Sequence, residues 1–223
     1  MHKLKSHNKF NLDKSYKYFP GLTIIKLFND EDLIKLIISL KRDMEQSGYF
    51  NKFVFLPEDS YHMTVCDLIT FNDLKTNKNF KRFPLKNETN IDLIDQYVYK
   101  LLKSDEFVLN VKMKLVKITS RKIHLQPKTK EDNLKLKLFR KKICEKLKIK
   151  LSDSYIFHIS LTYRLFDLTV DEKEKLNSFL DTLNSKYINK FSDIDIDIAN
   201  LAIFNDMSEY RKLLMGRKKL GNY

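Results

Sequence analysis

The chain has 223 residues, and its hydrophobic content of 43% with 32% charged residues indicates a globular protein and excludes a disordered chain. Its 42 Lys and Arg against 29 Asp and Glu give a net charge of +13, which favours an anionic partner such as nucleic acid or another phosphate ester, although a general lysine bias explains the charge equally well. No apolar run approaches the ~18 residues that a membrane span requires, so we expect a soluble, cytoplasmic protein.

The first half of the chain alternates between strand and helix patterns. One segment repeats apolar residues at helical spacing, with Asn29-Asp30 as a cap before it and Gly48 as a stop after it. The predicted elements of this half are a basic irregular arm at 1–19, strands at 22–27, 53–56 and 61–69, a helix at 31–46, and a loop at 72–90. Long loops inside compact domains are often functional, so we expect the loop to flank a site.

The second half repeats this alternation without a linker. Its predicted elements are helices at 91–102, 131–147 and about 176–187, strands at 107–118, 123–126, 155–163 and 194–204, and a basic helical tail from residue 207. Helices mixed with hairpins predict an α+β fold with largely antiparallel sheets. We therefore expect residues 1–223 to form a single domain, with residues 1–19 as its N-terminal arm.

Two predicted strands carry the same histidine pattern, 96 positions apart. One places His62 and Thr64 two residues apart in an apolar run, and the other does the same with His158 and Ser160. Because side chains alternate along a strand, each histidine shares a face with its hydroxyl residue, about 6.6 Å away. A lone histidine in a strand is more often structural. Two independent core histidines, however, have no reason to occur in the same sequence pattern.

Two imidazoles facing one cleft can divide the work of a general base and a general acid, since each has an unperturbed pKa near ~6.5. The hydroxyls of Thr64 and Ser160 would then donate hydrogen bonds to phosphate oxygens. Arg164 lies in phase with His158, so it either reaches a phosphate or is a solvated charge at the strand end. Tyr163 lies out of phase unless a bulge intervenes.

Other reactive residues have simpler explanations. His124 has no hydroxyl residue two positions later, and we interpret it as structural or as a surface residue. Cys66 shares a strand face with His62 but lies about 13 Å along the strand, so a Cys/His nucleophilic pair is not expected. Cys66 and Cys144, the only cysteines, lack the spacing of a zinc site or a disulfide framework.

A row of carboxylates near the C-terminus allows two interpretations. Asp193, Asp195 and Asp197 alternate with apolar residues, so they either ligate a metal or form the solvent face of a half-buried edge strand. The second interpretation needs fewer assumptions. No phosphate-binding loop, dinucleotide fingerprint, zincin motif or nucleophile elbow is present in the sequence. We therefore expect neither a metal nor a cofactor.

Several stretches, in their order and spacing, resemble the two-histidine (2H) phosphoesterase superfamily, and more narrowly a poorly characterised branch of it. The resemblance spans nearly the whole chain. The stretches are Lys9-Phe10, then FPGLTII at 19–25, Leu56-Pro57 before YHMTV at 61–65, Leu125-Gln126-Pro127 before a helix carrying Arg140, FHISLTY at 157–163, and FNDM at 204–207. Two departures are Ser160, where the branch usually has threonine, and Lys14, where we expect glycine.

This resemblance implies two pseudo-symmetric lobes of antiparallel sheet with flanking helices around a central cleft, and catalysis without a metal. One histidine would deprotonate water or a ribose hydroxyl, and the other would protonate the departing oxygen. Thr64 and Ser160 would hydrogen-bond the non-bridging oxygens. Tyr163 would stack on a base or donate its hydroxyl to the phosphate.

The sequence thus predicts a metal-independent phosphodiesterase acting on an RNA-type or nucleotide phosphodiester, either a 2′,3′-cyclic phosphate or a 2′,5′-linkage. One alternative is a basic module that binds RNA ends or nucleotides without hydrolysis, and it would show salt-dependent binding that survives loss of both histidines. A second is a metal-dependent nuclease or phosphatase built on the carboxylate row. We expect a monomer with no obligatory protein partner.

Overall fold

The computed structural model describes residues 5–74, 76, 78–105, 107–151, 154–191 and 193–214. Ten strands within this part form two antiparallel sheets. The larger sheet contains β1 (Gly21–Leu27), β3 (His62–Thr70), β4 (Val108–Ile118), β5 (Lys122–Pro127), β6 (His158–Ser160), β8 (Ile194–Ile198), β9 (Asn200–Phe204) and β10 (Arg211–Lys212). The smaller sheet pairs β2 (Phe53–Phe55) with β7 (Thr162–Arg164).

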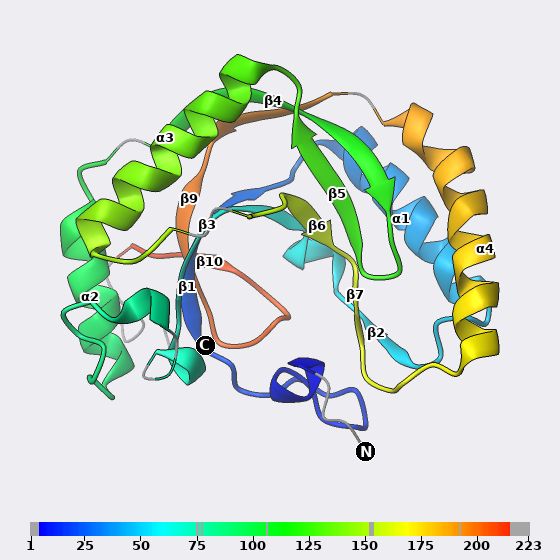
Figure 1. Cartoon of the computed structure of the whole chain (residues 1–223), viewed down its shortest axis with the longest axis horizontal. Coiled ribbons are helices and arrows are strands. Elements are labelled where there is room, and N and C mark those ends of the chain that lie inside the picture. Colours follow the sequence, from blue (N-terminus) through cyan, green and yellow to red (C-terminus); the bar gives the residue numbers. More distant parts are fainter. Residues whose placement is uncertain are drawn as a thin grey trace.

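The order of the larger sheet, β10-β9-β1-β3-β6-β5-β4-β8, forces it to curl. β8 lies at one edge and β9 lies next to the other edge, yet only Ala199 separates them in sequence. Consecutive Cα atoms are about 3.8 Å apart, so the two edges must come close together. Figure 1 shows the resulting curved sheet. The two halves of the sheet meet where β3 pairs with β6, and this pairing brings the two histidine strands side by side.

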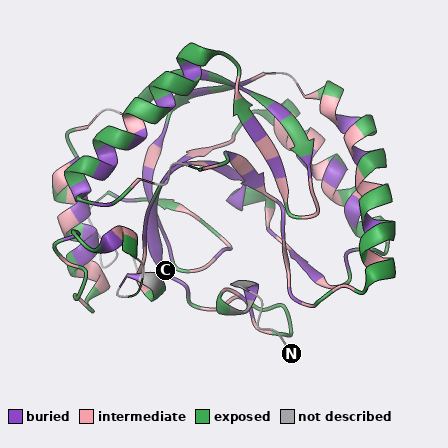
Figure 2. Cartoon of the chain, in the orientation of Figure 1, coloured by how far each residue is buried: buried purple, intermediate pink, exposed green. Residues whose placement is uncertain are grey.

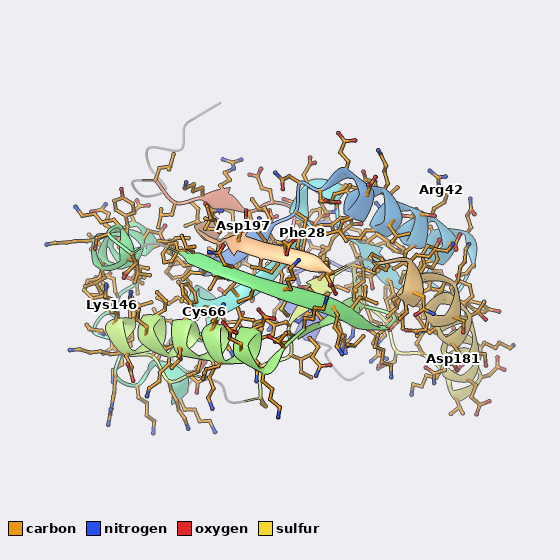
Figure 3. The ribbon with its side chains drawn as sticks, turned by 90° about the horizontal axis from the view of Figure 1, so that it is seen from above. Phe28, Arg42, Cys66, Lys146, Asp181 and Asp197 are labelled. Carbon is orange, nitrogen blue, oxygen red and sulfur yellow. The ribbon has the colours of Figure 1, made fainter. Side chains whose placement is uncertain are left out.

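The α-helices lie outside the sheet in two pairs (Figure 1). Within the described residues they are α1 (Glu31–Gln46), α2 (Ile91–Leu102), α3 (Lys130–Leu147) and α4 (Val170–Tyr187). α1 contacts α4, since the Tyr187 hydroxyl lies 3.0 Å from Ser39 Oγ and donates to Asp43 over 2.8 Å. The labelled residues in Figure 3, among them Arg42 on α1, Lys146 on α3 and Asp181 on α4, show these helices at the periphery.

Five short 3₁₀ helices connect these elements in the described residues: η1 (Lys5–Asn8), η2 (Glu58–Ser60), η3 (Phe71–Asp73), η4 (Lys78–Phe80) and η5 (Ile188–Lys190). β4 alternates between buried and exposed residues, as Figure 2 shows, because one of its faces packs on the core and the other faces solvent. No helix in the described ranges is both long and apolar enough to cross a membrane.

The structure confirms the predicted α+β fold and its helix signals. Asp30 accepts a hydrogen bond from the Leu33 amide at the start of α1, and Gly48 adopts a left-handed φ of 75° just after the helix. Two predicted strands are divided: residues 155–163 form β6 and β7 around Leu161, and residues 194–204 form β8 and β9 around Ala199.

The prediction of a helical tail from residue 207 is wrong for its described part. Residues 211–212 form β10, which pairs with β9, and the segment before them carries a turn in which Asp206 accepts a hydrogen bond from the Ser208 amide. Met207 and Leu213 are buried against the sheet. Tertiary packing therefore overrides the local helical tendency. Residues 215–223 of the predicted tail, and residues 1–4 of the predicted arm, lie outside the described part.

Gly21 offers a test of the packing between β1 and its neighbours. A Cβ atom at this position would lie 2.3 Å from Phe204 Cζ and 2.6 Å from the Ile69 carbonyl oxygen. We expect Gly21→Ala to lower the free energy of unfolding by about 1–3 kcal/mol, because β1 must move away from β3 and β9. Chemical denaturation measures the change. Gly48→Asn is the control, since no atom would lie within 4 Å of its Cβ; equal effects at both glycines would contradict the steric explanation.

Candidate active site

The two histidine motifs are crossed. In the antiparallel pairing of β3 with β6, Met63 lies opposite Ile159. Antiparallel geometry therefore sets His62 beside Ser160 and Thr64 beside His158. Met63 and Ile159 are both fully buried, so the motif side chains occupy the opposite face of the sheet. The pairing produces a local two-fold arrangement in which each histidine has the hydroxyl of the other motif as its neighbour.

Each histidine is held by the same kind of hydrogen bond. His62 Nδ1 lies 2.6 Å from the Ser60 carbonyl oxygen, and His158 Nδ1 lies 2.7 Å from the Ile156 carbonyl oxygen. Since a carbonyl only accepts, Nδ1 carries the proton in both rings. In the neutral imidazole the lone pair is then on Nε2. Both histidines thus present an unprotonated nitrogen that can act as a base.

Burial keeps both rings neutral. The pKa of His62 is lowered to about 4, mainly by desolvation and to a smaller extent by the positive charge of Lys9. The pKa of His158 is also lowered to about 4, again mainly by desolvation, with a smaller contribution from Lys122. The hydrogen bonds to Ser60 and Ile156 act in the opposite direction but are outweighed. At neutral pH, therefore, neither histidine of the ligand-free protein carries a charge.

Aromatic rings fix the positions of the catalytic candidates. The Tyr210 ring packs on His62, with 4.0 Å between the ring centroids, and the Tyr155 ring lies 6.2 Å from that of His158. Burial raises the pKa of the Tyr155 hydroxyl, and the neighbouring Thr64 side chain acts in the opposite direction. Tyr210 lies just before β10, and Tyr155 lies before β6. Neither tyrosine can be identified from the sequence, because neither belongs to a repeated motif and only the fold brings them to the histidines.

All the predicted site residues line one cavity with a volume of about 800 Å³. His62, Thr64, His158 and Ser160 lie in its wall, together with several cations. The lining cations are Lys9, Arg121, Lys122, Arg140, Lys150 and Arg164. Such a set of fixed positive charges favours a bound anion. The long loop at 72–90 also contributes, since Asn79 and Phe80 line the cavity.

Tyr163 and Arg164 reach the cavity because the second motif strand breaks at Leu161. Tyr163 and Arg164 therefore belong to β7, which pairs with β2 instead of continuing β6, and both side chains line the cavity. The Lys9 ammonium donates to the Tyr163 hydroxyl over 3.1 Å. The guanidinium of Arg164 lies 3.4 Å from Asp167, so an ion pair partly neutralises it.

Lys9 and Lys122 are the cations with the most direct effect on the histidines. Lys122 lies on β5 directly opposite Ser160, and burial lowers its pKa. The Lys9 ammonium lies over the Tyr163 ring, 4.8 Å from the centroid, and over the Phe19 ring at 5.0 Å. The sequence distinguishes Lys9 only as part of the family resemblance, and it does not distinguish Lys122 from the other lysines. Their positions depend on the pairing of β5 with β6 and on the packing of the N-terminal segment.

The remaining candidates lie elsewhere. His124 is opposite His158 on β5 but is not among the cavity residues. Cys66 is also absent from the cavity wall, so the prediction that it shares a face with His62 is wrong. Register shifts along β3 change the alternation, and the Cys66 sulfur lies 3.8 Å from that of Cys144. Both cysteines are free and buried, and the hydrogen bond with Cys144 and burial raise the pKa of the Cys66 thiol.

In the carboxylate row, Asp195 and Asp197 lie on the solvent side of the edge strand β8, and Asp193 directly precedes this strand. Asp193 pairs with Lys128, Asp195 pairs with Lys112 over 3.3 Å, and Asp197 pairs with Lys26. In the described part of the chain, no group of three or more His, Cys, Asp or Glu side chains is arranged to hold a metal ion. The surface explanation of this row therefore agrees with the structure better than the metal explanation does.

Comparisons with known proteins place these observations in context. The family model described as 2H-phosphodiest, a domain of unknown function (DUF1868), matches residues 9–124. The crystal structure of the conserved protein of unknown function ATU0111 from Agrobacterium tumefaciens str. C58 has a TM-score of 0.86 and 19% identity, covering 96% of this chain and 94% of that chain. At this identity the similarity shows a shared fold. No curated protein matches the chain.

The low pKa of His62 predicts an acid-sensitive fold. In the unfolded chain this histidine has a pKa near ~6.5, so as the pH falls from about 6.5 towards 4 the unfolded state takes up the proton first. The stability is fully present above pH ~6.5 and declines below it. We expect His62→Gln to reduce the loss of unfolding free energy between pH 7 and pH 5 by about 2 kcal/mol. Denaturation curves at both pH values measure this loss, and an identical loss in both proteins would contradict the assignment.

Proposed function

We propose that this chain, which belongs to the 2H-phosphodiest family, is a metal-independent phosphodiesterase that hydrolyses an RNA-type or nucleotide phosphodiester. One observation carries the proposal: two identically held, neutral histidines lie in crossed motifs within one cation-lined cavity. The expected substrates are a 2′,3′-cyclic phosphate or a 2′,5′-linkage. In both, a phosphodiester has a ribose oxygen as its leaving group.

The two imidazoles supply a complete set of proton transfers. Nε2 of one histidine accepts a proton from water as the water oxygen forms a bond to phosphorus. The bond between phosphorus and the 2′ or 3′ ribose oxygen breaks, and Nε2–H of the other histidine protonates that oxygen. One proton is thus taken up and one is released. A second turnover needs only proton exchange with solvent.

Substrate binding provides the acid. Both histidines are neutral in the free protein, whereas the reaction needs one of them protonated. A phosphodiester anion beside an imidazole favours the imidazolium, so binding raises the pKa of the neighbouring histidine. The carbonyl at each Nδ1 also favours the charged ring, because Nδ1–H remains a donor in both forms. The substrate therefore helps to charge the group that protonates its own leaving oxygen.

The hydroxyls and lysines stabilise the phosphorane-like transition state. Thr64 and Ser160 would donate to the two non-bridging oxygens, whose charge increases as the water attacks. Lys122, opposite Ser160, and Lys9, near His62, add positive charge on the same side of the cavity. Tyr163, hydrogen-bonded by Lys9, is a further donor to the phosphate or a surface for stacking.

The central test replaces the histidines. We expect His62→Ala and His158→Ala each to lower kcat on nucleoside 2′,3′-cyclic monophosphates by at least ~100-fold, the usual size of a lost acid or base. The assay contains EDTA and follows formation of the nucleoside monophosphate. His124→Ala is the matched control, because His124 lies opposite His158 but outside the cavity.

Turnover by either alanine variant near the wild-type rate would contradict the two-histidine mechanism. A wild-type protein that binds RNA in a salt-dependent way without hydrolysing any phosphodiester would instead support the non-hydrolytic binding module. Activity that EDTA abolishes would contradict metal independence.

The low histidine pKa values predict the pH dependence of catalysis. Since the acid must be protonated, and the pKa of each free histidine is about 4, kcat/KM should rise as the pH is lowered from 8 towards 5. Lys122→Gln removes a charge that lowers the pKa of His158, so it should shift the profile to higher pH. Lys135→Gln on the outer face of α3, where Lys135 pairs with Glu131, is the control. Superimposable profiles for wild type and Lys122→Gln would contradict the electrostatic explanation.

A further inference from the structure

The cavity extends well beyond the histidines, along the C-terminal half of β3. Two register shifts between β1 and β3 leave Val65 and Leu68 without partners on β1. Each of these unpaired residues is a β-bulge, and a bulge changes which side chains of the strand face the cavity. As a result Asp67 replaces Cys66 in the cavity wall, on the side of Thr64 and His158 away from His62. A carboxylate is thereby placed in a site whose other charged side chains are all cations.

Among the described residues, none donates a hydrogen bond to the Asp67 carboxylate or forms an ion pair with it within 4 Å. Its side chain is accessible to solvent through the cavity although protein surrounds it. Desolvation consequently raises the pKa of Asp67, while the charges of Arg140, Lys9 and Lys122 act in the opposite direction. The carboxylate is an acceptor directed at whatever fills the cavity.

Arg140 is the complementary donor. It comes from α3, is only 8% exposed, and lines the same cavity. Its guanidinium lies 4.4 Å from the centroid of the Tyr155 ring and 5.7 Å from that of Phe157, and its Nε has no hydrogen-bond partner among the described residues. Because Arg140 lines the cavity, a ligand there can accept a hydrogen bond from its guanidinium. The contact with the Tyr155 ring restrains this donor.

Apolar residues also line the cavity. Tyr155 and Phe80 provide aromatic rings, and Ile149 and Leu151 provide aliphatic surface. The Lys150 amide donates to the Asn79 carbonyl over 2.9 Å, which joins the loop at 72–90 to the segment after α3. An apolar pocket with aromatic rings, one acceptor and one planar donor is suited to a flat heterocycle with polar edges.

We propose that this pocket, defined by Asp67, Arg140, Tyr155 and Phe80, binds the nucleobase of the substrate and prefers guanine. The inference rests on the proposed function, because the phosphodiester must lie at the histidines for its base to reach Asp67. A carboxylate can accept both the N1–H and the N2–H of guanine, and a guanidinium can donate to its O6 or N7. Uracil presents one ring N–H between two carbonyl oxygens, so it gives the carboxylate one donor only.

The placement of the pocket fits a nucleotide. Asp67 lies three residues beyond Thr64 on a strand, at most ~10 Å along the chain. A ribose separates the base of a nucleotide from its phosphate and would fill this interval. Lys122 lies opposite Ser160, and the charge of Lys9 acts on His62, so both cations are placed to bind the phosphate beside the histidines. The base would then lie further along β3, at Asp67.

The test compares guanosine and uridine 2′,3′-cyclic phosphates in wild type and Asp67→Asn. We expect the wild type to favour guanosine by at least ~10-fold in kcat/KM, the effect of one bidentate contact. Asp67→Asn should bring the guanosine-to-uridine ratio close to one, because an amide cannot accept from both guanine donors. Asp171→Asn is the matched control, since Asp171 lies on α4 and pairs with Lys175.

A binding measurement distinguishes failure of the nucleobase pocket from failure of the phosphodiesterase proposal. Calorimetry with guanosine and uridine 3′-monophosphates uses the His62→Ala/His158→Ala protein, with and without Asp67→Asn. The pocket is supported if guanosine 3′-monophosphate binds at least ~10-fold more tightly than uridine 3′-monophosphate and Asp67→Asn removes this difference. This holds even if no cyclic phosphate is hydrolysed. Hydrolysis without base preference, or an Asp67→Asn variant that keeps the wild-type ratio, overturns the pocket and leaves the phosphodiesterase proposal intact.

Discussion

The pairing of β3 with β6 is the constraint on which the rest of the molecule depends. It joins the two halves of the larger sheet, and one pair of buried residues, Met63 and Ile159, lies at its centre. Because the strands are antiparallel, this register crosses the two motifs and gives each histidine a hydroxyl neighbour from the other half. A shift by one residue would turn one motif towards the core. The pairing thus fixes both the fold and the geometry of the candidate site.

Desolvation gives the same residues their chemical character. The rings are enclosed by Tyr210, Tyr155 and the strand backbone, and the lysines nearby further disfavour the imidazolium form. A site of this kind is neutral at its histidines and positive around them. Such a site therefore favours a bound anion, whose negative charge offsets that of the surrounding cations. This explains how two groups with the same low pKa can take different roles once an asymmetric substrate is bound.

Irregularities in the strands bring into the cavity the side chains that, in our interpretation, recognise the nucleobase. The break at Leu161 directs Tyr163 and Arg164 into the cavity, and the bulge at Val65 directs Asp67 into the same cavity. Regular strands would have placed Cys66 in the cavity and Tyr163 on the opposite face. Bulges often occur next to functional sites because they redirect single side chains without disturbing the sheet as a whole.

The sequence by itself determined the α+β class, all four described α-helices, and the two motif strands, because periodicity, caps and stop residues are local signals. It also determined the membership of the 2H-phosphodiest family, which the family match confirms. Only the tertiary structure decided that Asp67, Arg140, Tyr155, Lys122 and Tyr210 surround the histidines. Of these, only Arg140 belongs to a stretch that carries the family resemblance. Asp67 reaches the cavity through a bulge, Lys122 through cross-strand register, and the two tyrosines from the segments before β6 and β10. The tail after residue 207 shows the same limit, because pairing with β9 outweighed its local preference.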